Sequence, residues 1–205
     1  MPRIKQTERQ HTFEQTRQRL LLAAANEFSQ AGYLGANINA ISIAAGYAKG
    51  TVYNYFPSKQ ALLLALIDDT AQRHLDFVQQ RTLAESQPIQ RLKCFFQAGF
   101  EFVASHLPQA RVMLNTIYGA DETLKQHAFE AYQPLFRLIA EEILAPGMAQ
   151  GVFQDLEPGR TATLLMTVYL GTASHIDAQG RFWLEAEQVA RLALYGISKT
   201  PGDSG

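Results

Sequence analysis

Residues 37–60 read NINAISIAAGYAKGTVYNYFPSKQ. Asn37 is a favoured N-cap residue, because its side-chain oxygen can accept a hydrogen bond from an unpaired backbone N–H. Apolar residues at helical spacing follow, and Gly46 stands where the chain must reverse and positive φ is tolerated. Val52 and Phe56 are four residues apart, so they can pack on the preceding helix, and a proline then ends the pattern. The stretch predicts two short helices joined by a tight turn.

The second of these helices has a polar and aromatic outer face. It carries Lys49, Thr51, Tyr53, Asn54 and Tyr55. Such side chains suit a helix that touches phosphates and base edges, as the second helix of a helix-turn-helix does in the major groove. An ordinary pair of core helices is the alternative, but it rarely needs so polar an outer face. A DNA-binding regulator is therefore the leading interpretation.

The run from Gly35 to Leu63, centred on GYAKGTVYNYFPSKQAL, resembles the DNA-binding domain of the TetR family of bacterial transcription regulators. The resemblance implies an all-α protein, with a three-helix DNA-binding domain and N-terminal arm at residues 1–57. A larger helical ligand-binding and dimerisation domain is expected at residues 58–205. Ala48 stands where the family often has serine, which removes an N-cap worth about 1 kcal/mol from the second helix.

The same resemblance implies which residues meet double-stranded operator DNA. They are Asn37, Lys49, Gly50, Thr51, Tyr53, Asn54, Tyr55 and Lys59. Asn37 and Lys59 are expected on phosphates near helix ends, and Asn54 is a candidate for adenine recognition. The polar residues 1–12 are either a solvated tail or an arm that reaches the minor groove. Thr12 is expected to cap the first helix.

Charge is spread unevenly along the 205 residues. Residues 1–60 hold seven Lys or Arg against three Asp or Glu, whereas residues 61–205 hold eleven against sixteen. A basic end on an acidic body would orient the protein on a polyanion. The single cysteine, Cys94, allows no intrachain disulfide and fits a reducing compartment. No apolar run is long enough to cross a bilayer, so a cytoplasmic protein is expected.

The rest of the chain reads as helices without strand alternation. An amphipathic helix is expected from Ser58 to about Gln80, and further helices are expected at 88–105, 109–118, 121–145, 158–178 and 184–198. Pro134 should kink one of them, and Pro146-Gly147 should separate two.

The middle helices are rich in aromatic and flexible apolar residues, which can fill a core or line a pocket. With the resemblance, they predict a site for a small, hydrophobic effector. The candidate residues are Phe100, Met113, Ile117, Phe129, Tyr132, Phe136, Met166 and Tyr169.

The last two helices carry small and apolar residues along one side each. Two such pairs from two subunits would form a four-helix bundle, so a homodimer is expected. The candidate interface residues are Leu165, Val168, Gly171, Thr172, His175, Val189, Leu192 and Gly196.

Enzyme signatures are missing from the sequence: there is no glycine-rich phosphate loop, HExxH, nucleophile elbow or CxxC. The five histidines lack the short spacings typical of metal ligands, so neither a metal nor a cofactor is expected. The expected function is sequence-specific transcription regulation, by a repressor that a hydrophobic ligand releases. A nucleoid-organising or cell-division protein on the same scaffold remains an alternative, as does an all-α ligand-binding protein or enzyme.

Overall fold

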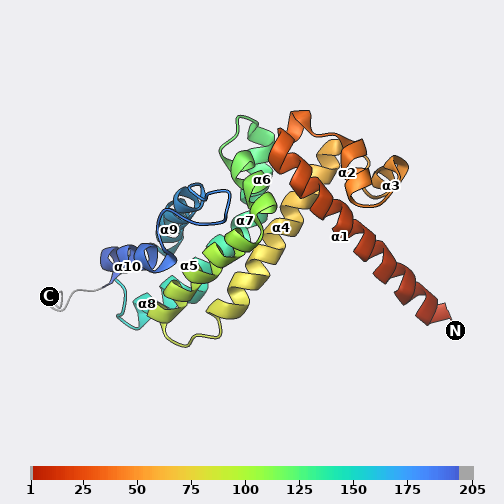
Figure 1. The fold of residues 1–205 in the computed structure, drawn as a ribbon. Helices are drawn as coiled ribbons and strands as arrows, with labels where there is room; N and C mark the ends of the chain where they lie inside the picture. Colours follow the sequence, from red (N-terminus) through yellow and green to blue (C-terminus); the bar gives the residue numbers. More distant parts are fainter. Residues whose placement is uncertain (1, 199–205) are drawn as a thin grey trace. The chain divides into compact units, whose positions relative to one another are not determined.

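The computed structural model describes residues 2–198, with side chains from Glu8 on. Its helices are α1 (Pro2–Gly35), α2 (Ile38–Ala44), α3 (Lys49–Tyr55), α4 (Lys59–Thr82), α5 (Pro88–Ser105), α6 (Leu107–Ile117), α7 (Glu122–Arg137), the π-helical segment η1 (Leu138–Leu144), α8 (Ala145–Ala149), α9 (Pro158–Ala173) and α10 (Ala186–Ile197) (Figure 1). Only two isolated β-bridges occur among the described residues. The all-α prediction is confirmed.

The chain forms two compact units. One comprises the residues up to Thr70 together with Pro108–Ala128, and the other comprises Ala71–Leu107 and the residues from Phe129 on. Helix α4 passes from the first unit into the second without interruption. The division at 57/58 into a DNA-binding and a ligand-binding domain stays a prediction about function.

The core of the first unit is built from α1 to α4. Leu20, Leu21, Ala24 and Phe28 of α1 are buried with Ile38 and Ile41 of α2, Val52 of α3, Phe56, and Leu62, Leu63, Leu66 and Ile67 of α4. These positions recur every three or four residues, so each helix buries one stripe against its neighbours. Helix α2 packs on α1, and α3 packs on α2.

Helix α1 begins at Pro2, so the prediction that Thr12 caps the first helix is wrong. The Thr12 hydroxyl instead donates to the carbonyl of Glu8 at 2.9 Å, one turn back within a continuing helix. Near its other end, Gly32 has φ 68° and ψ 173°, a non-helical conformation that only glycine adopts without strain. The last turn, Tyr33–Gly35, is therefore set at a different angle.

The second unit has an aromatic core. Buried residues come from α5 (Leu92, Phe95, Phe96, Phe100, Phe102), η1 (Ile139, Ile143, Leu144), α9 (Leu165, Met166, Tyr169) and α10 (Val189, Ala190, Ile197). Helix α10 packs along α5, and α9 packs against η1. A loop of residues 174–185 joins α9 to α10, closed by a bridge between Ile176 and Phe182.

The predicted break at Pro146-Gly147 is wrong, because both residues lie inside α8. Pro146 is in the first turn of α8, where a missing N–H is tolerated. Gly147 lies under the ring of buried Phe153, whose Cδ2 would be 2.2 Å from a Cβ at that position. The glycine therefore makes room for a side chain and does not end a helix.

Candidate DNA-binding surface and ligand pocket

The turn between α2 and α3 is fixed by a glycine and by a tyrosine that reaches α1. Gly46 has φ +81°, as the turn was predicted to need. The Tyr47 backbone N–H donates to the carbonyl of Ser42 at 2.8 Å, and the Tyr47 hydroxyl lies 3.2 Å from Oγ1 of Thr16 on α1. These bonds set the direction in which α3 leaves the turn.

Helix α3 has one buried and one exposed side. Val52 is buried, as is Phe56 at the end of the helix, whereas Lys49, Gly50, Tyr53 and Asn54 are exposed. Thr51 is half-buried between the two sides. Ala48 is the N-cap and makes no side-chain capping bond, as expected. The exposed side chains supply an ammonium group (Lys49), a phenol (Tyr53) and an amide (Asn54). Groups of these kinds bind phosphates and base edges.

Tyr55 is half-buried, because its ring stacks on Phe13 of α1 with centroids 4.4 Å apart and planes 23° apart. Half of the Phe13 surface stays exposed. Tyr55 therefore holds α3 against α1. Its proposed contact with DNA is limited to the part of the ring that this stack leaves open.

Lys59 and Asn37 both make bonds inside the protein. The Lys59 ammonium donates to the carbonyls of Leu34 and Ala36 at 3.0 and 3.2 Å, and it lies 5.1 Å from the ring centroid of Tyr33. Asn37 Oδ1 accepts the Asn39 N–H at 2.8 Å, which confirms the predicted N-cap. Lys59 thus joins the start of α4 to the end of α1, and any phosphate contact would use its remaining donor.

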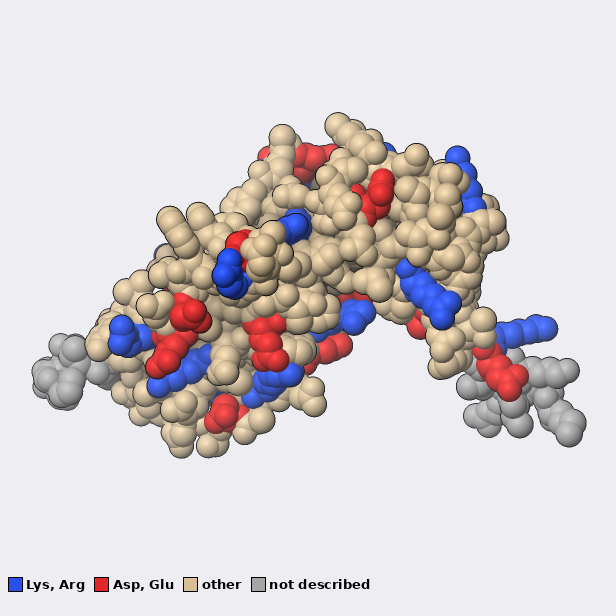
Figure 2. Space-filling model, viewed as in Figure 1, with Lys and Arg blue, Asp and Glu red and all other residues tan. Residues whose placement is uncertain are grey.

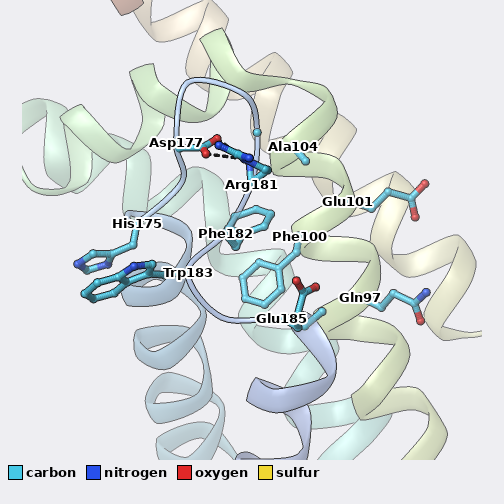
Figure 3. Close-up of a pocket in the computed structure, with 12 residues that line it drawn as sticks. Gln97, Phe100, Glu101, Ala104, His175, Asp177, Arg181, Phe182, Trp183 and Glu185 are labelled. Carbon is cyan, nitrogen blue, oxygen red and sulfur yellow. Dashed lines mark hydrogen bonds and ion pairs between the residues drawn. The ribbon is translucent and has the colours of Figure 1, made fainter.

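An open pocket of about 750 Å³ lies in the second unit between α5 and the 174–185 loop. Figure 3 shows Phe100 and Phe182 facing each other within it, with their ring centroids 4.8 Å apart. His175 stacks on Trp183 at 5.6 Å, and an ion pair of 2.7 Å joins Arg181 to Asp177. The volume suits a small-molecule ligand, and the lining combines aromatic rings with a few polar groups.

Three buried side chains of the second unit form a chain of hydrogen bonds. His74 of α4 bonds through Nδ1 to the Tyr132 hydroxyl at 3.2 Å and through Nε2 to the Tyr169 hydroxyl at 3.1 Å. Burial lowers the pKa of His74 to about 3 and raises the pKa of both phenols. All three groups, which we call the buried triad, are therefore uncharged at neutral pH.

Aromatic rings connect the buried triad with the pocket. The Tyr169 ring stacks on Phe100 with centroids 5.2 Å apart, and Phe100 lines the pocket. On the other side, His74 stacks on Phe102 at 4.4 Å, and Phe102 stacks on His106 at 4.2 Å. A displacement of Phe100 would therefore press on Tyr169, because a close-packed protein core has few voids that could absorb the movement.

The residues predicted to bind a ligand are divided between the two units. Met113 and Ile117 belong to the first, and the other six belong to the second. Phe100, Tyr132, Met166 and Tyr169 are buried, whereas Phe129 is exposed and lies 6.0 Å from the ring of Phe136. Of the eight, Phe100 lines the pocket of Figure 3.

The residues predicted at a subunit interface also face different ways. Leu165 and Val189 are buried inside the second unit, so they cannot meet a partner. Val168, Leu192, Gly196 and His175 are exposed, while Gly171 and Thr172 are half-buried. The outward sides of α9 and α10 also carry large apolar residues that the prediction omitted: Leu164, exposed by 64%, and Tyr195, exposed by 80%.

Charged side chains of both signs occur on the surface of the second unit. Figure 2 shows basic and acidic side chains interspersed over the area around α5 and α10 on the face it presents.

No group of three His, Cys, Asp or Glu that could hold a metal occurs among the described residues. None of the helices described is both long and apolar enough to cross a membrane.

Comparison with known proteins supports the assignment of the N-terminal region. Residues 20–66 match the family model described as bacterial regulatory proteins, tetR family. The chain is 46% identical over 55 residues to the uncharacterized HTH-type transcriptional regulator YdgC of Bacillus subtilis. The matched segment covers 27% of this chain and 28% of YdgC. The first curated relatives are matched over only 28% and 48% of their length.

Longer matches cover both units. The HTH-type transcriptional repressor KstR2 of Mycobacterium tuberculosis is 29% identical over 153 residues, or 67% of this chain and 70% of KstR2. The structure of FadR from Bacillus subtilis, solved with stearoyl-CoA, superposes with a TM-score of 0.76 at 17% identity and covers 87% of this chain and 95% of that one. At this identity the structural match shows the fold alone.

Proposed function

Since this chain belongs to the TetR family of bacterial regulatory proteins, we propose that it is a homodimeric transcription repressor. It binds operator DNA through α3 and leaves the DNA when a small hydrophobic acyl compound binds in the second unit. Such a regulator acts in the cytoplasm, where its operator lies. The relatives above are named as transcription regulators, which supports a regulatory role over a catalytic one.

The observation that carries the DNA-binding part is the outer side of α3. Lys49, Tyr53 and Asn54 are exposed on a helix whose opposite side is anchored by Val52. Direct base contacts are therefore assigned to Tyr53 and Asn54, and phosphate contacts to Lys49 and the backbone at Gly50. Thr51 lies at the edge of this surface. The helices around it are held in place by Tyr55, Asn37 and Lys59.

One short helix offers few contacts, so two copies are proposed to bind two half-sites about 34–36 Å apart. The dimer surface proposed here is the outward side of α9 and α10. It keeps Val168, Leu192 and Gly196, with Gly171, Thr172 and His175 at its edge, and gains Leu164 and Tyr195. Such a set of exposed apolar side chains on two neighbouring helices is unusual for a surface that faces water.

The ligand part is proposed for the pocket between α5 and the 174–185 loop. Its aromatic lining suits an acyl chain or a planar apolar group. FadR from Bacillus subtilis, which shares the fold, was crystallised in complex with stearoyl-CoA. Acyl thioesters are therefore the first compounds to test.

Helix α4 is proposed to carry the signal. Its residue His74 belongs to the buried triad, and its residue Asp69 accepts a hydrogen bond of 2.8 Å from Gln18 of α1. A ligand that displaces His74 would move a helix that also holds α1, and so change the spacing of the two α3 helices. A coupling of about 1–3 kcal/mol is enough for a clear fall in operator occupancy.

Footprinting of the purified protein on the DNA upstream of its own gene tests this function. A protected site with two-fold symmetry, lost when an acyl-CoA is added, is the expected result. Salt-sensitive binding to all DNA without a protected site would contradict a repressor and favour a nucleoid-organising protein. If the footprint forms but no acyl-CoA changes it, the protein is still a DNA-binding regulator, but acyl-CoA compounds are not its effectors.

A further inference from the structure

The buried triad holds more hydrogen-bond donors than it can use. Neutral His74 has one N–H and one bare nitrogen, and Tyr132 and Tyr169 have one O–H each, which makes three donor hydrogens. The described hydrogen bonds of these groups are the two at His74. In whichever direction the bonds run, one tyrosine donates to the bare nitrogen and the other accepts from the N–H. The accepting tyrosine keeps an O–H that donates to no described residue.

Such a hydrogen is unusual at this depth. His74, Tyr132 and Tyr169 are exposed by 2%, 7% and 1%. Both hydroxyls have a hydrogen-bond partner in His74, but an O–H buried without an acceptor of its own is still costly. A phenylalanine in place of either tyrosine would leave the N–H or the bare nitrogen of His74 without a partner, so both tyrosines are needed to pair the imidazole. An acceptor that arrives with a ligand would pair the O–H that is left over.

The His74 tautomer decides which of the two phenols has an O–H that is not donated to His74. With the proton on Nδ1, His74 donates to Tyr132, Tyr169 donates to Nε2, and Tyr132 has the spare hydrogen. With the proton on Nε2, Tyr132 donates to Nδ1, His74 donates to Tyr169, and Tyr169 has the spare hydrogen. A ligand acceptor beside either phenol would select the corresponding tautomer.

Tyr169 is the phenol next to the pocket. Its ring stacks on Phe100, which in turn faces Phe182 of the loop (Figure 3). Gly99 lets this ring sit against α5, because a Cβ at Gly99 would be 2.8 Å from Cε2 and 3.1 Å from the hydroxyl oxygen of Tyr169. A ligand that displaces Phe100 and Phe182 would therefore meet Tyr169 before Tyr132, whose only described ring contact is with His74.

We propose that Tyr169 donates this hydrogen to the carbonyl oxygen of the effector, and that the His74 imidazole, which bonds to the Tyr169 hydroxyl, positions that hydroxyl. The acceptor is a neutral carbonyl, as in a thioester, an ester or a ketone. The described bonds of the triad include no Lys or Arg, and a carboxylate buried without a cation is strongly disfavoured. This inference rests on the proposed ligand pocket and specifies its chemistry.

The test compares three probes whose hydrocarbon chains have the same number of carbon atoms. They are the thioester S-decanoyl-N-acetylcysteamine, its thioether analogue S-decyl-N-acetylcysteamine, and decanoate. Calorimetry measures the Kd of each for the wild type, Tyr169→Phe and Tyr132→Phe. The wild type should bind the thioester about tenfold more tightly than the thioether, since one buried hydrogen bond is at stake. It should also bind the thioester more tightly than decanoate. Tyr169→Phe should bind thioester and thioether equally, and Tyr132→Phe should keep the preference.

Three results would overturn the assignment: no preference for the thioester in the wild type, a full preference in Tyr169→Phe, or a preference lost in Tyr132→Phe. Failure of all three probes to bind would also overturn it. Thermal unfolding checks that both variants fold, and the operator footprint is recorded in parallel. An unchanged footprint with an overturned ligand result would reject the carbonyl site and leave DNA-binding regulation standing.

Discussion

Gln18 of α1 donates a hydrogen bond of 2.8 Å from Nε2 to Oδ1 of Asp69 on α4. The same carboxylate lies 3.6 Å from the guanidinium of Arg17. The preceding residue, Asp68, pairs with Nε2 of His127 on α7 at 2.8 Å. Two adjacent carboxylates of α4 thus bond to residues of α1 and α7 within the first unit. An acidic pair on an amphipathic helix is more typical of a solvated face.

Replacement of Asp69 by alanine should weaken the link between α4 and α1. The carboxylate is only 14% exposed, so we expect the free energy of unfolding to fall by about 1–2 kcal/mol. We also expect the effector to reduce operator affinity by a smaller factor, because α1 no longer follows α4. Asp76→Ala, at an exposed position of the same helix, is the control. If the effector lowers operator affinity by the same factor in both variants, Asp69 does not transmit the signal from α4 to α1.

Lys49 and Lys59 should differ in what they stabilise. Lys59→Met removes two charge-assisted hydrogen bonds to the end of α1, so we expect a loss of about 1–2 kcal/mol in the free energy of unfolding. Lys49→Met should leave unfolding unchanged and should reduce the slope of log affinity against log salt by about one ion. Urea unfolding and operator titrations at several salt concentrations measure both effects. The reverse pattern would contradict the assignment.

The outward side of α9 and α10 should be required for dimerisation. Leu192 is 70% exposed in a single copy, so Leu192→Glu should not disturb the fold. In the dimer it would bury an unpaired carboxylate, and we expect dissociation at micromolar concentration. Light scattering after gel filtration measures the mass. Leu22→Glu on α1, exposed by 55%, should remain dimeric. A dimeric Leu192→Glu variant would place the interface elsewhere.

Acid should destabilise the fold through His74. Its folded pKa is about 3, below the unfolded value of 6.5, so between these values the unfolded chain binds a proton that the folded chain does not. The free energy of unfolding should therefore fall with decreasing pH, by up to about 1.4 kcal/mol per pH unit from this group. His74→Phe should remove this share of the slope between about pH 6 and pH 4. Identical slopes for the two proteins would contradict a buried neutral histidine.

The local signals in the sequence were enough for the helix-turn-helix. Gly46, Val52 and Phe56 act over a few residues, and the structure has the turn and the buried side where they predicted them. The start of α1 was missed because Thr12 has the residue pattern of a cap, while the polar residues before it are also compatible with helix. Local patterns of this kind cannot tell a cap from a continuing turn.

The ligand and dimer surfaces depend on packing between distant residues. The partners of His74 are 58 and 95 residues away in sequence, so no local pattern could predict these hydrogen bonds. In α9, Leu164 and Leu165 are adjacent and both apolar, but one is exposed and the other buried. When both sides of a helix are apolar, periodicity does not tell which side faces its own core.

The most direct measurement is the affinity of the double variant Lys49→Ala, Tyr53→Ala for the footprinted operator, beside Lys93→Ala as a control at an exposed position of α5. If α3 reads the operator, the double variant should bind about a hundredfold more weakly, because each lost contact is worth about 1–3 kcal/mol. Lys93→Ala should bind as the wild type does, and all three proteins should unfold at the same temperature. An unchanged operator affinity in a folded double variant would contradict the account.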